Sequence, residues 1–262
     1  MFRIIKMTSN IIKANIMVAL MYPASFYTSS LSSILWIGLS MISITVLTYQ
    51  SPELGGWNKH QLFAVQGVYS IILGTMYFMF GENFKKLIRL INKGDLDLLL
   101  TKPVDSQFLV SVGENKIHQL SRVLGGIILL TYALSALHVN VGIRDIIQFL
   151  FFMLLSCIII YSIWFLLVTL TIWLTNLFNI DELFTHLTGL SRYPLEVFRY
   201  LNRYLFYLVL PLVIITSVPT QIILKKPDLW LMIAAVLVAG ILFFCSRMFW
   251  FFALKFYTSA SS

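Results

Sequence analysis

Six long apolar segments occupy most of this 262-residue chain and limit the folds open to it more than any other feature. They lie at Tyr22–Tyr49, Leu62–Phe80, Val123–Leu137, Ile146–Thr175, Tyr204–Leu224 and Leu229–Leu254. Most reach the roughly 20 residues with which an α-helix crosses a bilayer, and we expect the short third one to begin earlier, near His118. Backbone groups inside lipid must be hydrogen-bonded within the segment, so such runs are helical. The sequence therefore predicts an all-α integral membrane protein with six transmembrane helices.

The composition leaves little material outside these segments. Hydrophobic residues make up 59% of the chain and charged residues 11%, and the longest polar stretch, residues 81–122, is too short for a soluble catalytic domain. We therefore expect a single membrane domain over residues 1–262. The net charge of +8 does not indicate nucleic-acid binding, because membrane proteins carry basic cytoplasmic loops. Cys157 and Cys245 lie in apolar segments and the histidines are scattered, so neither a disulfide nor a metal site is predicted.

The distribution of Lys and Arg predicts the orientation. If alternate connections face the same side, all but four of the 19 Lys and Arg residues fall on one side. The four exceptions are Lys59, Arg144, Lys225 and Lys226. The basic side of a membrane protein faces the cytoplasm. Both termini and residues 82–117 are therefore expected in the cytoplasm, and residues 50–61 and 138–145 outside.

The first twenty residues have the pattern of an amphipathic helix. Phe2, Ile5 and Ile12 recur near helical spacing, while Arg3 and Lys13 fall on the opposite face. Such a helix lies in the membrane interface with its basic face near anionic headgroups. The alternative is a simple cytoplasmic extension of the first span.

Two spans carry a stripe of mostly small residues at helical spacing. The first stripe consists of Ser29, Ser33, Trp36, Ser40 and Ser43. The second consists of Gly67, Gly74 and Gly81. Small residues allow close packing of membrane helices, and this interpretation is favoured for both stripes. The alternative is that the serine stripe lines a substrate path.

Residues 176–202 form the least regular segment, which we expect to be interfacial or partly re-entrant. Asp181, Glu182 and His186 could form an acid–base cluster, and an integral-membrane enzyme acting on lipids would have its site there. Ordinary solvated groups are favoured, and no catalytic residue is assigned. Asp and Glu are missing from the middle of every span, which disfavours an ion-coupled carrier because carriers place ionisable groups there.

Four sequence runs occur in an order and between spans that are typical of one family. They are KKLIRLINKGDLDLLLTKP at residues 85–103, SRYPLEVF at 191–198, the pair Pro211 and Pro219, and LKFYTSASS at 254–262. Together they resemble permease subunits of bacterial type II ABC exporters, and the resemblance covers the whole chain. It implies a multi-pass protein of the bacterial cell membrane that is not itself an enzyme.

In that family, permeases pair in the membrane and bind cytoplasmic ATPase subunits. ATP and Mg²⁺ would be bound by the partner ATPase, and this chain contains no G-x-x-x-x-G-K-[ST] motif. The second permease would be identical or homologous, and the residues 1–20 helix matches the interfacial elbow of the family. The loop residues that match the family's ATPase-coupling element are Gly94, Asp95, Leu96, Asp97, Lys102 and Pro103. The resemblance does not select a substrate.

Individual roles can be expected within this loop. Gly94 would end the preceding helix in a left-handed conformation. Asp95 and Asp97 would present carboxylates to the partner, while Leu96, Leu98 and Leu99 would supply apolar anchors. The alternative is a self-contained loop that rests on the membrane surface.

Overall fold

The computed structural model describes Met17, Met21 and residues 23–51, 53–174, 180–200 and 203–257. A helix occupies each predicted span: α2 (Pro23–Gln50), α3 (Lys59–Lys93), α6 (Leu120–Ala136), α7 (Ile143–Thr169), α9 (Arg203–Ile223) and α10 (Leu229–Ala253). Among the described residues, five helices are long and apolar enough to cross a membrane, while α9 contributes the shorter apolar run Val209–Ile223. The predicted all-α membrane fold is confirmed. The interfacial helix expected over residues 1–20 lies outside the described residues, apart from Met17.

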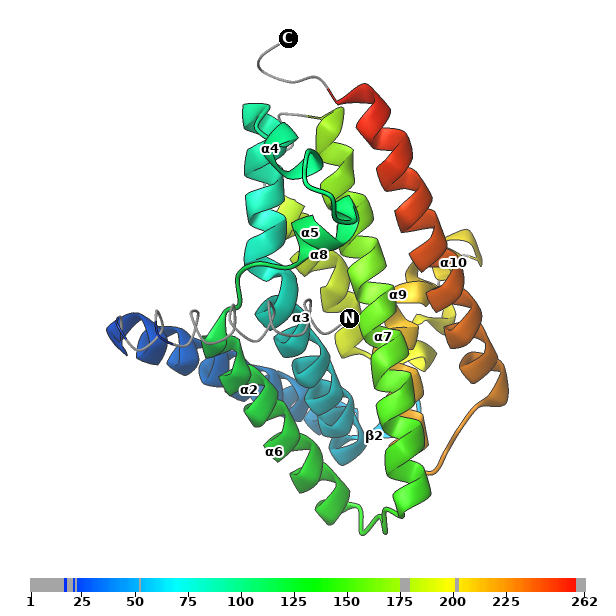
Figure 1. Ribbon diagram of the computed structural model, residues 1–262. Coiled ribbons are helices and arrows are strands. Elements are labelled where there is room, and N and C mark those ends of the chain that lie inside the picture. Colours follow the sequence, from blue (N-terminus) through cyan, green and yellow to red (C-terminus); the bar gives the residue numbers. More distant parts are fainter. Residues whose placement is uncertain are drawn as a thin grey trace.

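Short elements connect the long helices, and one follows the last of them (Figure 1). They are β1 (Glu53–Leu54), β2 (Trp57–Asn58), α4 (Asp97–Leu100), α5 (Ser106–Ser111), η1 (Ile117–Gln119), η2 (Leu170–Ile172), α8 (Ile180–Gly189), η3 (Leu190–Arg192), η4 (Leu195–Tyr200) and η5 (Leu254–Phe256). We call the end of the bundle with α4 and η5 the loop end. The opposite end holds the antiparallel β1–β2 hairpin and the α6–α7 and α9–α10 connections, and we call it the hairpin end.

Helix α3 is the longest and forms the centre of the bundle. It starts with a capping box, in which Asn58 and Gln61 exchange side-chain-to-backbone hydrogen bonds of 3.0 and 3.1 Å. It continues past the predicted end of the span at Phe80 and ends at Lys93. The extension is amphipathic: Leu87 and Ile91 are buried, while its basic residues face outward. The helix therefore continues beyond the apolar span as the basic helical segment that ends before Gly94, as expected from the sequence.

Glycines bring α3 and α6 into backbone contact. A Cβ atom on Gly67 would lie 2.9 Å from the Gly126 carbonyl oxygen, and one on Gly126 would lie 2.8 Å from the Gly67 carbonyl oxygen. A Cβ on Gly74 would lie 2.8 Å from the Val123 side chain. A Cβ on Gly81 would instead lie 3.1 Å from the Tyr77 side chain of α3 itself and 3.8 Å from Trp164 of α7. The prediction that the glycine stripe packs between helices is confirmed, and Gly126 is the partner that the sequence did not indicate.

The segment α8–η3–η4 runs beside α3 from the loop end toward the hairpin end. Asp181 forms an ion pair of 3.0 Å with Lys85, Thr185 bonds the Tyr77 hydroxyl, and the Arg192 guanidinium lies 5.2 Å from the Tyr69 ring centre. Farther along, the Trp57 indole donates a 2.8 Å hydrogen bond to Glu196. Counting Arg192 among the basic residues at the loop end was therefore wrong, because it lies beside Tyr69, in the third of α3 nearest the hairpin end.

Helix α9 is held on both sides by hydroxyl groups. Pro219 has no N–H for the carbonyl of Ile215, and the Ser156 hydroxyl of α7 donates to that carbonyl at 2.7 Å. On the other side, the Ser191 hydroxyl donates to Leu212 O, and the Thr216 hydroxyl donates to Ser191 O, both at 2.6 Å. These bonds satisfy backbone groups that lipid could not, and they fix η3 against α9.

Candidate coupling loop and substrate cavity

The loop that follows α3 begins at a left-handed glycine. Gly94 has φ 72° and ψ 17°, and its N–H bonds the carbonyls of the last helical turn. The Asp95 N–H bonds Leu90 O at 3.0 Å, which completes a Schellman-type end. The expected role of Gly94 is confirmed. Because the turn is fixed, Asp95 is exposed at the loop end, as are Lys102 and Pro103, while Asp97 is half-buried in the first turn of α4.

Leu96 differs from the expectation. Its side chain is fully buried within the chain, and its N–H donates a 3.0 Å hydrogen bond to the Tyr257 hydroxyl after α10. Leu96 therefore cannot serve as an apolar anchor for a partner in this conformation. It holds the loop against the segment that follows α10.

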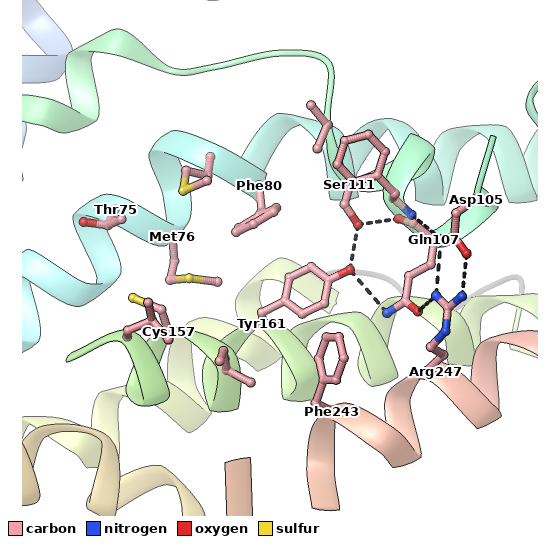
Figure 2. A pocket seen from close by; sticks show the side chains of 15 residues that line it. Thr75, Met76, Phe80, Asp105, Gln107, Ser111, Cys157, Tyr161, Phe243 and Arg247 are labelled. Carbon is pink, nitrogen blue, oxygen red and sulfur yellow. Dashed lines mark hydrogen bonds and ion pairs between the residues drawn. The ribbon is translucent and has the colours of Figure 1, made fainter. Parts of the chain in front are cut away.

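After the loop, helix α5 links this end to α7 and α10 through a polar network (Figure 2). Arg247 of α10 binds Asp105 at 2.5 Å and Gln107 at 3.2 Å. The Tyr161 hydroxyl of α7 contacts Gln107 at 3.3 Å and Ser111 at 2.8 Å. The Arg247 hydrogen bond holds the pKa of Asp105 below its ordinary value, so the carboxylate is ionised at neutral and mildly acidic pH.

Helix α5 was not predicted, although the sequence contains a local signal for it. Asp105 precedes a run of helix-compatible residues, and its carboxylate accepts the Phe108 N–H at 3.0 Å as an N-cap. Beside the network, an apolar crevice of about 630 Å³ opens between α3, α7 and α10. Met79 and Phe243, which line it, are exposed, so this crevice opens to the outer surface of the bundle.

The serine stripe of α2 lines a second cavity, of about 440 Å³, together with α3, α6 and α8. Its lining residues are Ser29, Ser32, Ser33, Trp36, Ile37, Ser40, Gln66, Tyr69, Ser70, Leu73, Tyr77, His118, Gln119, Arg122, Thr185 and Arg192. A smaller cavity of about 110 Å³ shares Trp36, Ser40, Gln66 and Arg192 with it and adds Ser43. Every member of the stripe thus borders one of these two neighbouring cavities.

The stripe is not a tight helix contact in this chain. Trp36 is 64% exposed, and Ser33 and Ser40 donate to carbonyls of their own helix, at 3.1 and 2.8 Å. These hydroxyl oxygens can still accept hydrogen bonds from a ligand in the cavity. The sequence pattern did not indicate Tyr69, Arg122 or Arg192 as part of the same space; the only signal was that ionisable residues near or within spans are uncommon.

Asp181, Glu182 and His186 do not converge on one point. Asp181 faces Lys85 on α3, whereas Glu182 and His186 form an exposed pair at 3.8 Å on α8. Among the described residues, no three His, Cys, Asp or Glu side chains are grouped to hold a metal ion. The geometry gives no support to a catalytic centre in this segment.

Comparison with known proteins identifies the family. The model of the ABC-2 family transporter proteins matches residues 34–261, which includes the loop and every long helix except the start of α2. No curated protein and no solved structure matches the chain. The match covers most of the chain, and the helical membrane fold agrees with it. The chain belongs to the ABC-2 family of transporter proteins.

Proposed function

We propose that this chain is the permease subunit of an ATP-driven exporter and that the loop Gly94–Pro103 docks on a separate ATPase subunit, which binds ATP and Mg²⁺. The observation that carries this proposal is the fixed, charged loop at one end of the bundle in a chain of the ABC-2 family. Asp95 and Asp97 would contact the ATPase. Lys102 and Pro103 would border the contact, while Gly94 and Leu96 hold the loop in place.

The connections of the loop support a role in transmitting movement. A nucleotide cycle can drive transport only if the ATPase contacts two membrane conformations differently. The loop is bonded to Tyr257 through Leu96, and α5 is bonded to Arg247 and Tyr161. A displacement of the loop would therefore reach α7 and α10 directly.

A pair of permeases would enclose the substrate path. The serine-lined cavity opens beside α2, and the opposite face of α2 exposes large apolar side chains that lipid or a second permease would cover. Leu31, Leu35, Ile42 and Val46 form this exposed face. Helix α2 thus presents small polar residues to the cavity and apolar residues to its surroundings. This distribution is expected for a helix that borders a substrate path between two permeases, identical or homologous.

The proposed location is the bacterial cell membrane, with the loop end and both termini in the cytoplasm. In this orientation α8–η3–η4 is a re-entrant segment, because it runs from the cytoplasmic end of α3 to the external hairpin. Its backbone is irregular at membrane depth, which is tolerated where the segment is buried in protein or lines a cavity. Ser191 of this segment is hydrogen-bonded to Leu212 and Thr216 of α9, so one side of the segment is buried in protein. Thr185 and Arg192 line the cavity on the other side.

Cysteine labelling tests the orientation, in a background without Cys157 and Cys245. Val104 at the loop end is 47% exposed, and Asn140 at the hairpin end is exposed. A membrane-impermeant maleimide added to intact cells should label Asn140→Cys and spare Val104→Cys until the cells are opened. Labelling of Val104→Cys from outside would refute the orientation.

Purification from the native membrane tests the assembly. The tagged chain, extracted in mild detergent, should retain an ATPase subunit and a second permease, both identified by mass spectrometry. A chain that remains monomeric and free of any ATPase under conditions that preserve other transporters would contradict the proposal.

A further inference from the structure

The serine-lined cavity contains two arginines that share one aromatic ring. The guanidinium carbons of Arg122 on α6 and Arg192 on η3 lie 5.5 and 5.2 Å from the centre of the Tyr69 ring. Both side chains are half-buried and both line the cavity. Two positive charges from different elements are therefore directed to one region, although like charges repel each other in a partly desolvated site.

The carboxylates of the chain do not compensate these charges. All 11 Asp and Glu residues fall within the described ranges, and none of them lines the cavity. The ion pairs between described residues join these carboxylates to other bases, as Glu82 to Lys116 and Asp105 to Arg247. An ionised group away from water is expensive without a partner, so an anion from outside the chain would complete this site.

Unused polar atoms lie in the same cavity. Arg192 Nε, Ser70 Oγ and Gln119 Oε1 are buried and have no hydrogen-bond partner among the described residues, and Ser70 is only 1% exposed. Buried polar groups are almost always bonded, to protein, water or a ligand. The guanidinium Nε–H and the serine O–H are donors suited to phosphate or carboxylate oxygens, and Gln119 can accept from a hydroxyl or amide.

We propose that Arg122 and Arg192 bind the phosphate or carboxylate group of an organic anion that this permease carries, with Ser70 as a further donor. The inference rests on the proposed function, because it assigns a substrate class to the same path. A cavity of about 440 Å³ holds the anionic group and a small organic body. Trp36 and Tyr77 would contact that body, and a longer apolar part would extend along α2 toward the lipid.

Binding can be measured on the intact permease without nucleotide. The chain is placed in nanodiscs of phosphatidylcholine and its melting temperature is followed against phenyl phosphate, with benzyltrimethylammonium as a cationic probe of similar size. A ligand that binds the folded state raises the melting temperature in a saturable way. Phenyl phosphate should do so and benzyltrimethylammonium should not.

The variants assign the effect to the two arginines. Arg122→Gln and Arg192→Gln should each raise the dissociation constant about ten-fold or more, because each removes charged hydrogen bonds, and the double variant should lose binding. Arg144→Gln removes the same charge from an exposed site at the hairpin end and should bind like the parent. If the double Gln variant does not fold, Arg122→Lys with Arg192→Lys keeps both charges and should bind more weakly than the parent.

The source of the anion is decided by a second arm, in which phosphatidylglycerol replaces part of the phosphatidylcholine. Stabilisation by phosphatidylglycerol alone, lost in the double variant, would assign the site to a lipid headgroup; stabilisation by phenyl phosphate would assign it to water-soluble anions. No saturable effect in either arm, equal binding of the cation, or full binding by the double variant would overturn the proposal. Because the assay contains no ATPase, its failure leaves the co-purification result unaffected.

Discussion

Replacement of Asp95 and Asp97 together by Lys will abolish transport and the stimulation of the partner ATPase, while the membrane domain stays folded. Both carboxylates lie at the loop end, and Asp95 is exposed. Reversing two charges changes an attractive contact with a complementary surface into a repulsive one, and like-charge contacts across an interface cost several kcal/mol. We therefore expect at least a hundred-fold loss of ATPase affinity, since about 1.4 kcal/mol corresponds to ten-fold.

The fold should tolerate the change, for reasons visible in the loop. The turn is held by Gly94, the buried Leu96 side chain and the Tyr257 hydroxyl, none of which is altered. Lys in place of Asp97 loses a favourable charge in the first turn of α4, a change of about 0.3–1 kcal/mol. The measurements are membrane insertion, melting temperature, ATPase co-purification and transport in reconstituted vesicles.

A charge reversal at the opposite end provides the control. Glu53 is exposed in the hairpin, and Glu53→Lys should leave ATPase binding and transport near the parent level. If the Asp95 and Asp97 double variant also retains its ATPase and transports normally, the loop is not the coupling element. The alternative, a self-contained loop on the membrane surface, would then hold.

Replacement of Gly126 by Leu will lower the melting temperature of the permease strongly. Among the glycine-to-leucine replacements on α3 and α6, only Gly67→Leu should have an effect as large. The Gly126 Cβ would lie 2.8–2.9 Å from backbone atoms of Gly67 and Ile71, and backbone cannot rotate out of the way as a side chain can. The helices would have to separate along their closest contact. Overpacking of this kind costs about 1–3 kcal/mol, and occasionally more.

The surroundings of the other glycines predict a graded series. Gly74→Leu should be milder, because its shortest contact is with the Val123 side chain and the nearest backbone atom, Val123 N, lies farther away, at 3.1 Å. Gly240→Leu on α10 is the matched control, since no atom lies within 4 Å of its Cβ position. Melting temperatures in one detergent would rank the variants. If Gly126→Leu melts like Gly240→Leu, the close contact between α3 and α6 does not stabilise the fold.

Much of the architecture could be predicted from the sequence because it depends on local chemistry. A run of about 20 apolar residues forms a helix in lipid wherever its neighbours are, so each span was found at nearly the correct place. The end of α3 could be predicted because it needs a left-handed residue, and glycine adopts that conformation without steric cost wherever the rest of the chain lies. The glycines of α3 likewise predicted a close helix contact, since small side chains permit it on any suitable partner.

What the sequence could not provide is which surfaces meet. Gly126 packs against Gly67. The Leu96 side chain is buried, and its N–H bonds the Tyr257 hydroxyl. Arg192 lies with Arg122 against the Tyr69 ring and not at the loop end. Residues 69, 122 and 192 are far apart in the chain, so no local sequence pattern predicts that their side chains lie together. The sequence alone determined that this chain is a helical membrane protein with a capped polar loop. The tertiary structure decided the cavity and its charge, because both arise only where α2, α3, α6 and α8–η3 pack against one another.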